Sequence, residues 1–64
     1  MNALTQKIKI LIVDDHQVVR QGLRLFMELQ DDFQVIGEAG DGIAALEMVR
    51  ALKPDVVLMD LVMP

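Results

Sequence analysis

The chain has 64 residues, of which 53% are hydrophobic, and its ten acidic and six basic side chains give a formal net charge of −4. This length allows a single domain, and a composition with only two aromatic residues is typical of an aliphatic α/β core rather than a disordered segment. Scattered basic residues argue against a nucleic-acid interface, the lack of cysteine excludes disulfides and thiolate metal sites, and the lack of a long apolar stretch predicts no membrane span and a cytoplasmic protein.

The first half of the sequence predicts a strand, a helix and a second strand. Residues 1–6 carry no pattern and are expected to form a loose lead-in. Residues 8–13 form a nearly continuous run of β-branched residues and Leu, which is typical of a central strand covered on both faces. Apolar residues then recur at three- and four-residue spacing from Val18 to Leu29, which predicts an amphipathic helix of about three turns. Residues 33–36 follow as a short edge strand.

The second half repeats this pattern once more. Residues 37–42 contain three glycines but lack the spacing of a dinucleotide-binding loop, so we interpret them as a turn. A helical stripe of Ala45, Met48, Val49 and Leu52 then runs to Lys53-Pro54, where proline ends the helix. Residues 55–60 form the last predicted strand. The order strand, helix, strand, helix, strand predicts an α/β fold with right-handed crossovers and a parallel sheet.

Two of the predicted strands end in acidic residues. Asp14 and Asp15 follow the first strand, and Asp60 ends the last. Because parallel strands end at the same edge of a sheet, the three carboxylates are expected to meet there and to bind Mg²⁺. A carboxylate can attack phosphorus, and Asp60 stands alone, so we interpret it as a nucleophile that becomes an aspartyl-phosphate. Asp15 is then a direct metal ligand, Asp14 holds metal-bound water, and the backbone carbonyl of Val62 is a further ligand.

Each of these features also has a purely structural interpretation. An Asp pair after a strand often forms a turn or caps the next helix. His16 lies beside the acids, but with no second imidazole in the chain we interpret it as a solvated loop histidine rather than a ligand. The basic residues are expected on solvated helix faces, and the five methionines are expected to fill gaps in the core.

Taken together, these motifs resemble the receiver domain of two-component response regulators. His16 after the acidic pair and the segment 35–39 resemble the NarL/FixJ-like branch, whose members carry a helix-turn-helix DNA-binding domain. The segments that carry the family resemblance are residues 10–16, 37–42, 45–46 and 53–64.

The resemblance implies a flavodoxin-like fold with strand order 2-1-3 in this part of the domain. It also implies phosphoryl transfer from a sensor histidine kinase to Asp60 with Mg²⁺, by a phosphoacceptor rather than an enzyme, and control of DNA through a domain outside this chain. A complete receiver continues through two more strands and three more helices. We therefore expect residues 7–64 to be its first half, without the Ser/Thr and Lys at the ends of the fourth and fifth strands, and impaired in signalling.

In strand order 2-1-3, the third strand lies at an edge of the sheet. Such an edge recruits another strand, so we expect a homo-oligomer formed through residues 56–59. An alternative function is therefore a self-assembling fragment or interaction module without phosphotransfer. A Mg²⁺-dependent phosphatase is disfavoured, because it would need a second acid two residues after Asp60, where the chain has Val62.

Overall fold

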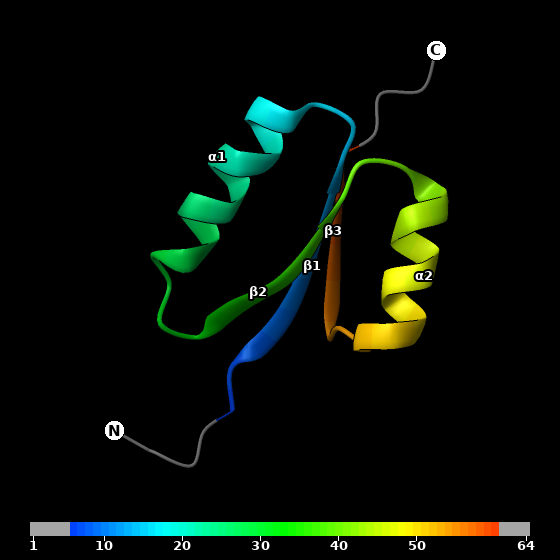
Figure 1. Cartoon of the computed structure of the whole chain (residues 1–64). Helices are drawn as coiled ribbons and strands as arrows, with labels where there is room; N and C mark the ends of the chain where they lie inside the picture. Colours follow the sequence, from blue (N-terminus) through cyan, green and yellow to red (C-terminus); the bar gives the residue numbers. More distant parts are fainter. Residues whose placement is uncertain (1–5, 61–64) are drawn as a thin grey trace.

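The computed structural model describes residues 6–60, and for Asp60 the backbone alone. Two helices flank a three-stranded sheet in which all strands are parallel and the order is β2-β1-β3 (Figure 1). The predicted fold and strand order are thus confirmed. In chain order the elements are β1 (Ile8–Asp14), α1 (Gln17–Glu28), β2 (Phe33–Ala39), α2 (Gly42–Leu52) and β3 (Val56–Asp60).

Strand β1 is the central strand, and its side chains alternate between the two faces of the sheet. Ile10 and Ile12 form a buried cluster with Val35 of β2, and α1 packs Leu23 and Met27 against this cluster. Ile12 is fully buried. The apolar run in the sequence therefore has the cause predicted for it, which is burial of the strand on both faces.

Helix α2 covers the opposite face, where Leu11 and Val13 form a cluster with Ala39 and Ala45. The helix lies close to β2 at Gly37. A Cβ atom on this glycine would lie 3.1 Å from Leu52 Cδ1 and 3.2 Å from Leu11 Cδ1. A side chain here would displace these leucines by a few tenths of an ångström, so the packing of α2 on the sheet favours glycine.

Strand β2 is longer than the sequence indicated. It runs to Ala39, so residues 37–39, which were predicted as part of a turn, belong to the strand. Ile10 pairs with Val35 but Leu11 pairs with Gly37, which leaves Ile36 as an extra residue at a bulge. The bulge shifts the alternation of the side chains, so a pattern of period two could not be followed past it.

Several predicted apolar contacts are absent from the described part of the chain. Val18 and Leu25 of α1 and the following Leu29 are exposed, so the apolar stripe is wider than the surface that packs on the sheet. Met59 on β3 is 58% exposed, and its predicted role as a core residue is wrong, whereas Met27 and Met48 do pack against the core. Within residues 6–60, no helix has the length and apolar character that a membrane span requires.

Candidate metal centre

The site is built at the carboxyl end of β1, where the chain turns into α1. Asp14 is the last residue of β1 and pairs in register with Asp60, the last residue of β3. The two acidic strand ends are therefore adjacent, as predicted. The side chain of Asp60 and all of Val62 lie outside the described part of the structure, so their roles remain predictions.

The carboxylate of Asp14 is buried, and only one of its two oxygens accepts a hydrogen bond from the described residues. The residue is 1% exposed. Its Oδ1 atom accepts a hydrogen bond from the backbone N–H of His16 at 2.7 Å, whereas Oδ2 is buried and has no hydrogen-bond partner among the described residues. Burying an oxygen of a carboxylate without a partner is unfavourable, and a bound cation would satisfy it. This unpaired oxygen fits the predicted metal site.

Two further side chains lie beside Asp14. Asp14, Asp15 and His16 each offer one ligand atom, and these atoms lie within 4.8 Å of one another. His16 Nδ1 is 2.8 Å from Asp15 Oδ1 and 3.4 Å from Asp14 Oδ1. His16 is solvent-exposed, as predicted, but its ring also faces the two carboxylates, and this contact was not predicted from the sequence. Carboxylate oxygens are the ligands that Mg²⁺ prefers.

The turn interpretation of the Asp pair is also correct. The bond from the His16 N–H to Asp14 Oδ1 spans two residues and is an Asx-type turn. The residue that caps α1 is His16, and it makes no side-chain capping bond. One oxygen of Asp14 therefore serves the turn and the other is left for a ligand.

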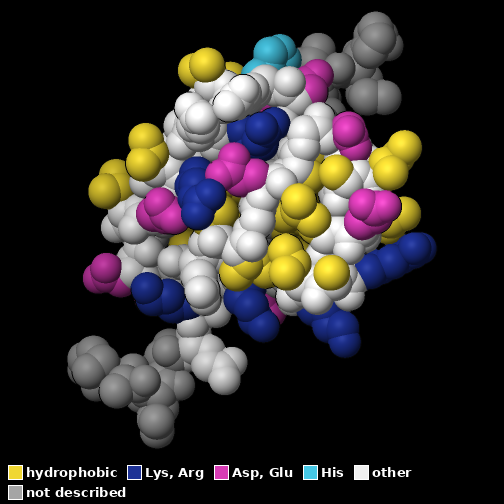
Figure 2. Space-filling model, viewed as in Figure 1, with side chains coloured by type: hydrophobic (Ala, Val, Ile, Leu, Met, Phe, Trp, Pro, Cys, Tyr) yellow, Lys and Arg dark blue, Asp and Glu magenta, His cyan; other side chains and the backbone are white. Residues whose placement is uncertain are grey.

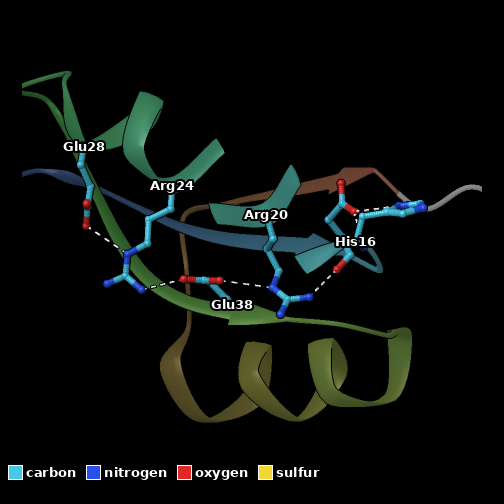
Figure 3. A network of polar contacts seen from close by, with 6 residues as sticks. His16, Arg20, Arg24, Glu28 and Glu38 are labelled. Atoms are coloured by element: carbon cyan, nitrogen blue, oxygen red, sulfur yellow. Dashed lines mark hydrogen bonds and ion pairs between the residues drawn. The ribbon is translucent and has the colours of Figure 1, made fainter. Parts of the chain in front are cut away.

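A network of four charged side chains adjoins this site (Figure 3). The Arg20 guanidinium donates to the backbone carbonyl of Asp14 at 2.7 Å and to Glu38 Oε1 at 3.2 Å. Arg24 donates to Glu38 Oε2 at 2.6 Å and to Glu28 Oε2 at 3.2 Å. The hydrogen bond from Arg24, followed by that from Arg20, lowers the pKa of Glu38 despite its partial burial. The hydrogen bonds to Glu38 and then to Glu28 raise the pKa of Arg24.

The prediction that the basic residues lie on solvated faces is wrong for Arg20, whose side chain is 20% exposed. In Figure 2, basic and acidic side chains mingle on the α1 side of this view, whereas hydrophobic side chains gather beside α2. The sequence does carry one signal, because Arg20 and Arg24 are one helical turn apart and share a face of α1. Their partner Glu38 could not be identified without the docking of α1 on β2.

Comparisons with known proteins agree on one family. The model of the response regulator receiver domain matches residues 10–64. The uncharacterized transcriptional regulatory protein YhcZ of Bacillus subtilis is 58% identical over 57 residues, which are 89% of this chain and 27% of that protein. The oxygen regulatory protein NreC of Staphylococcus aureus is 49% identical over 57 residues, which are 89% of this chain and 26% of that protein. The chain thus spans about a quarter of the length of the curated relatives it matches.

Solved structures give the same result. The response regulator domain of Thermotoga maritima CheB superposes with a TM-score of 0.86 and 42% identity, covering 92% of this chain and 44% of that chain. The signal receiver domain of the response regulator NarL from Mycobacterium tuberculosis gives a TM-score of 0.85 and 42% identity, covering 92% of this chain and 48% of that chain. At these identities, the likeness extends beyond the fold to the family.

Proposed function

Because the chain belongs to the response-regulator receiver family and its relatives are NarL- and LiaR-type regulators, we propose that it is a phosphoacceptor whose Asp60 takes a phosphoryl group from a sensor histidine kinase. Receiver domains are signalling domains, and we propose self-catalysed transfer onto Asp60 rather than turnover of a separate substrate. The observation that supports this most strongly is the buried, unpaired oxygen of Asp14, one strand away from Asp60.

The proposed transfer is an in-line displacement at phosphorus. A carboxylate oxygen of Asp60 forms a bond to phosphorus as the bond from phosphorus to the kinase histidine nitrogen breaks, and the electron pair leaves with that nitrogen. Asp14, Asp15, Asp60 and the backbone carbonyl of Val62 would hold Mg²⁺, with Asp14 acting through a metal-bound water. When bound, the ion supplies positive charge that neutralises the phosphoryl oxygens.

The role of the whole protein is part of the proposal. The relatives include proteins named as transcriptional regulatory proteins, and the chain spans about a quarter of their length. We propose that a DNA-binding output domain lies elsewhere in the protein and that phosphorylation of Asp60 controls it. A regulator that receives its signal from a kinase and acts on bacterial DNA works in the cytoplasm, which is the location we propose.

Phosphorylation can be tested by incubating the protein with acetyl phosphate and Mg²⁺ and measuring its intact mass. We expect a gain of one phosphoryl group in the wild-type protein and none in Asp60→Asn. Asp31→Asn is the matched control, because it removes the same charge from an exposed turn that precedes β2, at the amino ends of the strands. This variant should be labelled like the wild type. Absence of labelling in the wild type, or labelling of Asp60→Asn, would contradict the proposal.

A second candidate, self-assembly, is supported by the edge of the sheet. Among residues 6–60, β3 pairs with β1 alone, and Val56, Val57 and Met59 are 43%, 38% and 58% exposed. An apolar strand with one unpaired edge recruits another strand, and two copies of β3 related by a two-fold axis would form one continuous sheet. Sedimentation equilibrium should then give a dimer, and a stable folded monomer would exclude this candidate. A dimer that acetyl phosphate does not label would favour self-assembly over phosphotransfer.

A further inference from the structure

We propose that Arg20 is a positioning residue for the metal centre: its guanidinium, anchored by Glu38, fixes the turn that carries Asp14 and Asp15. This inference rests on the proposed function, because it concerns the same acidic site. Arg20 was expected to lie in solvent, and its contact is with the backbone of the site rather than with any ligand atom. It would therefore act through the conformation of the turn.

The turn after β1 is fixed by one hydrogen bond within the turn and by two from Arg20 of α1. From within, the His16 N–H donates to Asp14 Oδ1. From α1, Arg20 contributes twice: its backbone N–H donates to the His16 carbonyl at 2.9 Å, and its guanidinium donates to the Asp14 carbonyl at 2.7 Å. Only the guanidinium bond depends on the side chain. Replacing Arg20 therefore removes one defined constraint and leaves the first turn of the helix intact.

The guanidinium is itself held in place. Glu38 of β2 accepts from Nε at 3.2 Å, so the planar group spans from β2 to the end of β1. The backbone of Gly40 lies on a further side, since a Cβ atom there would be 3.3 Å from Arg20 Nη1. A guanidinium donates in a rigid planar fork, which lets one side chain bind two fixed acceptors at once. Lysine, with a single ammonium group, reproduces this geometry poorly.

Whether Arg20→Gln weakens or strengthens Mg²⁺ binding distinguishes a positioning role of Arg20 from an effect of its charge alone. A positive charge beside a cation site repels the cation, so if Arg20 acted by charge alone, Arg20→Gln would strengthen Mg²⁺ binding. If Arg20 positions the turn, the same substitution weakens binding, because Asp14 and Asp15 must then be ordered when the ion binds. Residues that orient metal ligands typically change metal affinity by about 10–100-fold when they are replaced.

Arg24 provides the matched control. It lies one turn further along α1 and also donates to Glu38, at 2.6 Å, but it makes no hydrogen bond to the turn. Arg24→Gln removes the same charge and a bond to the same carboxylate. A role in stability alone would thus be shared by the two arginines, whereas positioning would belong to Arg20.

The test measures Mg²⁺ affinity by isothermal titration calorimetry in the wild type, Arg20→Gln, Arg20→Lys and Arg24→Gln. We expect about tenfold weaker binding in Arg20→Gln, partial recovery in Arg20→Lys, and a change below about twofold in Arg24→Gln. Gly40→Ala, which retains the charge but crowds the guanidinium, should weaken binding less than Arg20→Gln. Unchanged or tighter binding in Arg20→Gln would overturn the inference.

A second readout does not need the metal. Hydrogen exchange of the His16 amide, measured by NMR without Mg²⁺, should be faster in Arg20→Gln than in Arg24→Gln, because this amide donates to Asp14 within the turn. Equal exchange in the two variants would overturn positioning even if the protein is phosphorylated normally. Conversely, a wild-type protein that neither binds Mg²⁺ nor accepts phosphate would refute the proposed function, and the exchange rates would still decide whether Arg20 orders the turn.

Discussion

Within residues 6–60, two strands are followed by a turn into a helix, and an aspartate at each turn has different surroundings. After β1, Asp14 Oδ1 accepts from the His16 N–H at 2.7 Å, and after β2, Asp41 Oδ1 accepts from the Ala44 N–H at 2.8 Å. Asp41 is exposed and caps α2, whereas Asp14 is 1% exposed and its second oxygen has no partner within the part of the chain that the structure describes. Each aspartate thus accepts one backbone hydrogen bond, and the two differ in the burial of the second carboxylate oxygen.

This difference comes from the position of each strand in the sheet. Strand β1 is central and covered by a helix on each face, so a carboxylate at its end is withdrawn from water. Strand β2 is an edge strand, and the turn that follows it remains in solvent. We therefore propose that the burial of its unsatisfied oxygen makes Asp14 a ligand-binding group. A solvated aspartate in the equivalent turn only caps a helix.

The largest expected difference between the two turns is in metal affinity. Asp14→Asn should weaken Mg²⁺ binding by about 100-fold, because it removes the charge of the buried carboxylate at the site. Asp41→Asn should leave the affinity within about twofold of the wild type, although it makes the same chemical change. Isothermal titration calorimetry of the two variants measures both. Equal losses in the two would mean that Mg²⁺ responds to overall charge and not to this turn.

A smaller effect, on stability, is expected where α2 packs against Gly37 of β2. Gly37→Ala places a methyl group 3.2 Å from Leu11 Cδ1, whose side chain is fully buried, and should lower the free energy of unfolding by about 1–3 kcal/mol. Gly22→Ala in α1 is the control, since its Cβ has nothing within 4 Å, and it should raise stability by about 0.5–1 kcal/mol. Urea unfolding followed by circular dichroism suits a chain without tryptophan. A tolerated Gly37→Ala would show that α2 can move away from β2.

Asp14 should matter more than Asp41 for metal affinity, but Asp41 should matter more than Asp14 for the stability of the metal-free protein. Asp41→Ala removes the cap of α2 and should cost about 1 kcal/mol of stability. Asp14→Asn, measured with a chelator present, should cost less than this or raise stability, because the variant no longer buries a charged, unpaired oxygen. The same unfolding experiment compares them. A large loss in metal-free Asp14→Asn would mean that the buried charge stabilises the turn without a ligand.

The smallest expected effect is a pH dependence on the α1 side of the first turn. Arg24, and then Arg20, lower the pKa of Glu38 in the folded protein below its unfolded value. The resulting stabilisation is therefore present above the usual glutamate pKa of about 4.3 and is lost as the pH falls below it. Glu38→Gln should be less stable than the wild type near neutral pH, and the difference should shrink in acid. A difference that does not change with pH would contradict this ion-pair network.

Much of this fold could be predicted from the sequence because its signals are local. The apolar run of β1 and the periodicity of the helices depend on neighbouring residues, and the acidic ends of β1 and β3 follow from their positions in a parallel sheet. The bulge at Ile36 and the exposure of Met59 could not be predicted, since they depend on register and on which surfaces pack. For the same reason, Asp14 and Asp15 were predicted as site residues from their place after β1, whereas the role of Arg20 was missed because it depends on how α1 docks on the sheet.

We propose that the unpaired oxygen of Asp14 makes the first turn, and not the second, a cation site. A Mg²⁺ titration followed by ¹H–¹⁵N NMR compares the two turns within one molecule. We expect saturable shifts of the Asp15 and His16 amides, while the amides of Asp41 and Ala44 stay unchanged. Shifts of similar size at both turns, or none at the first, would contradict it.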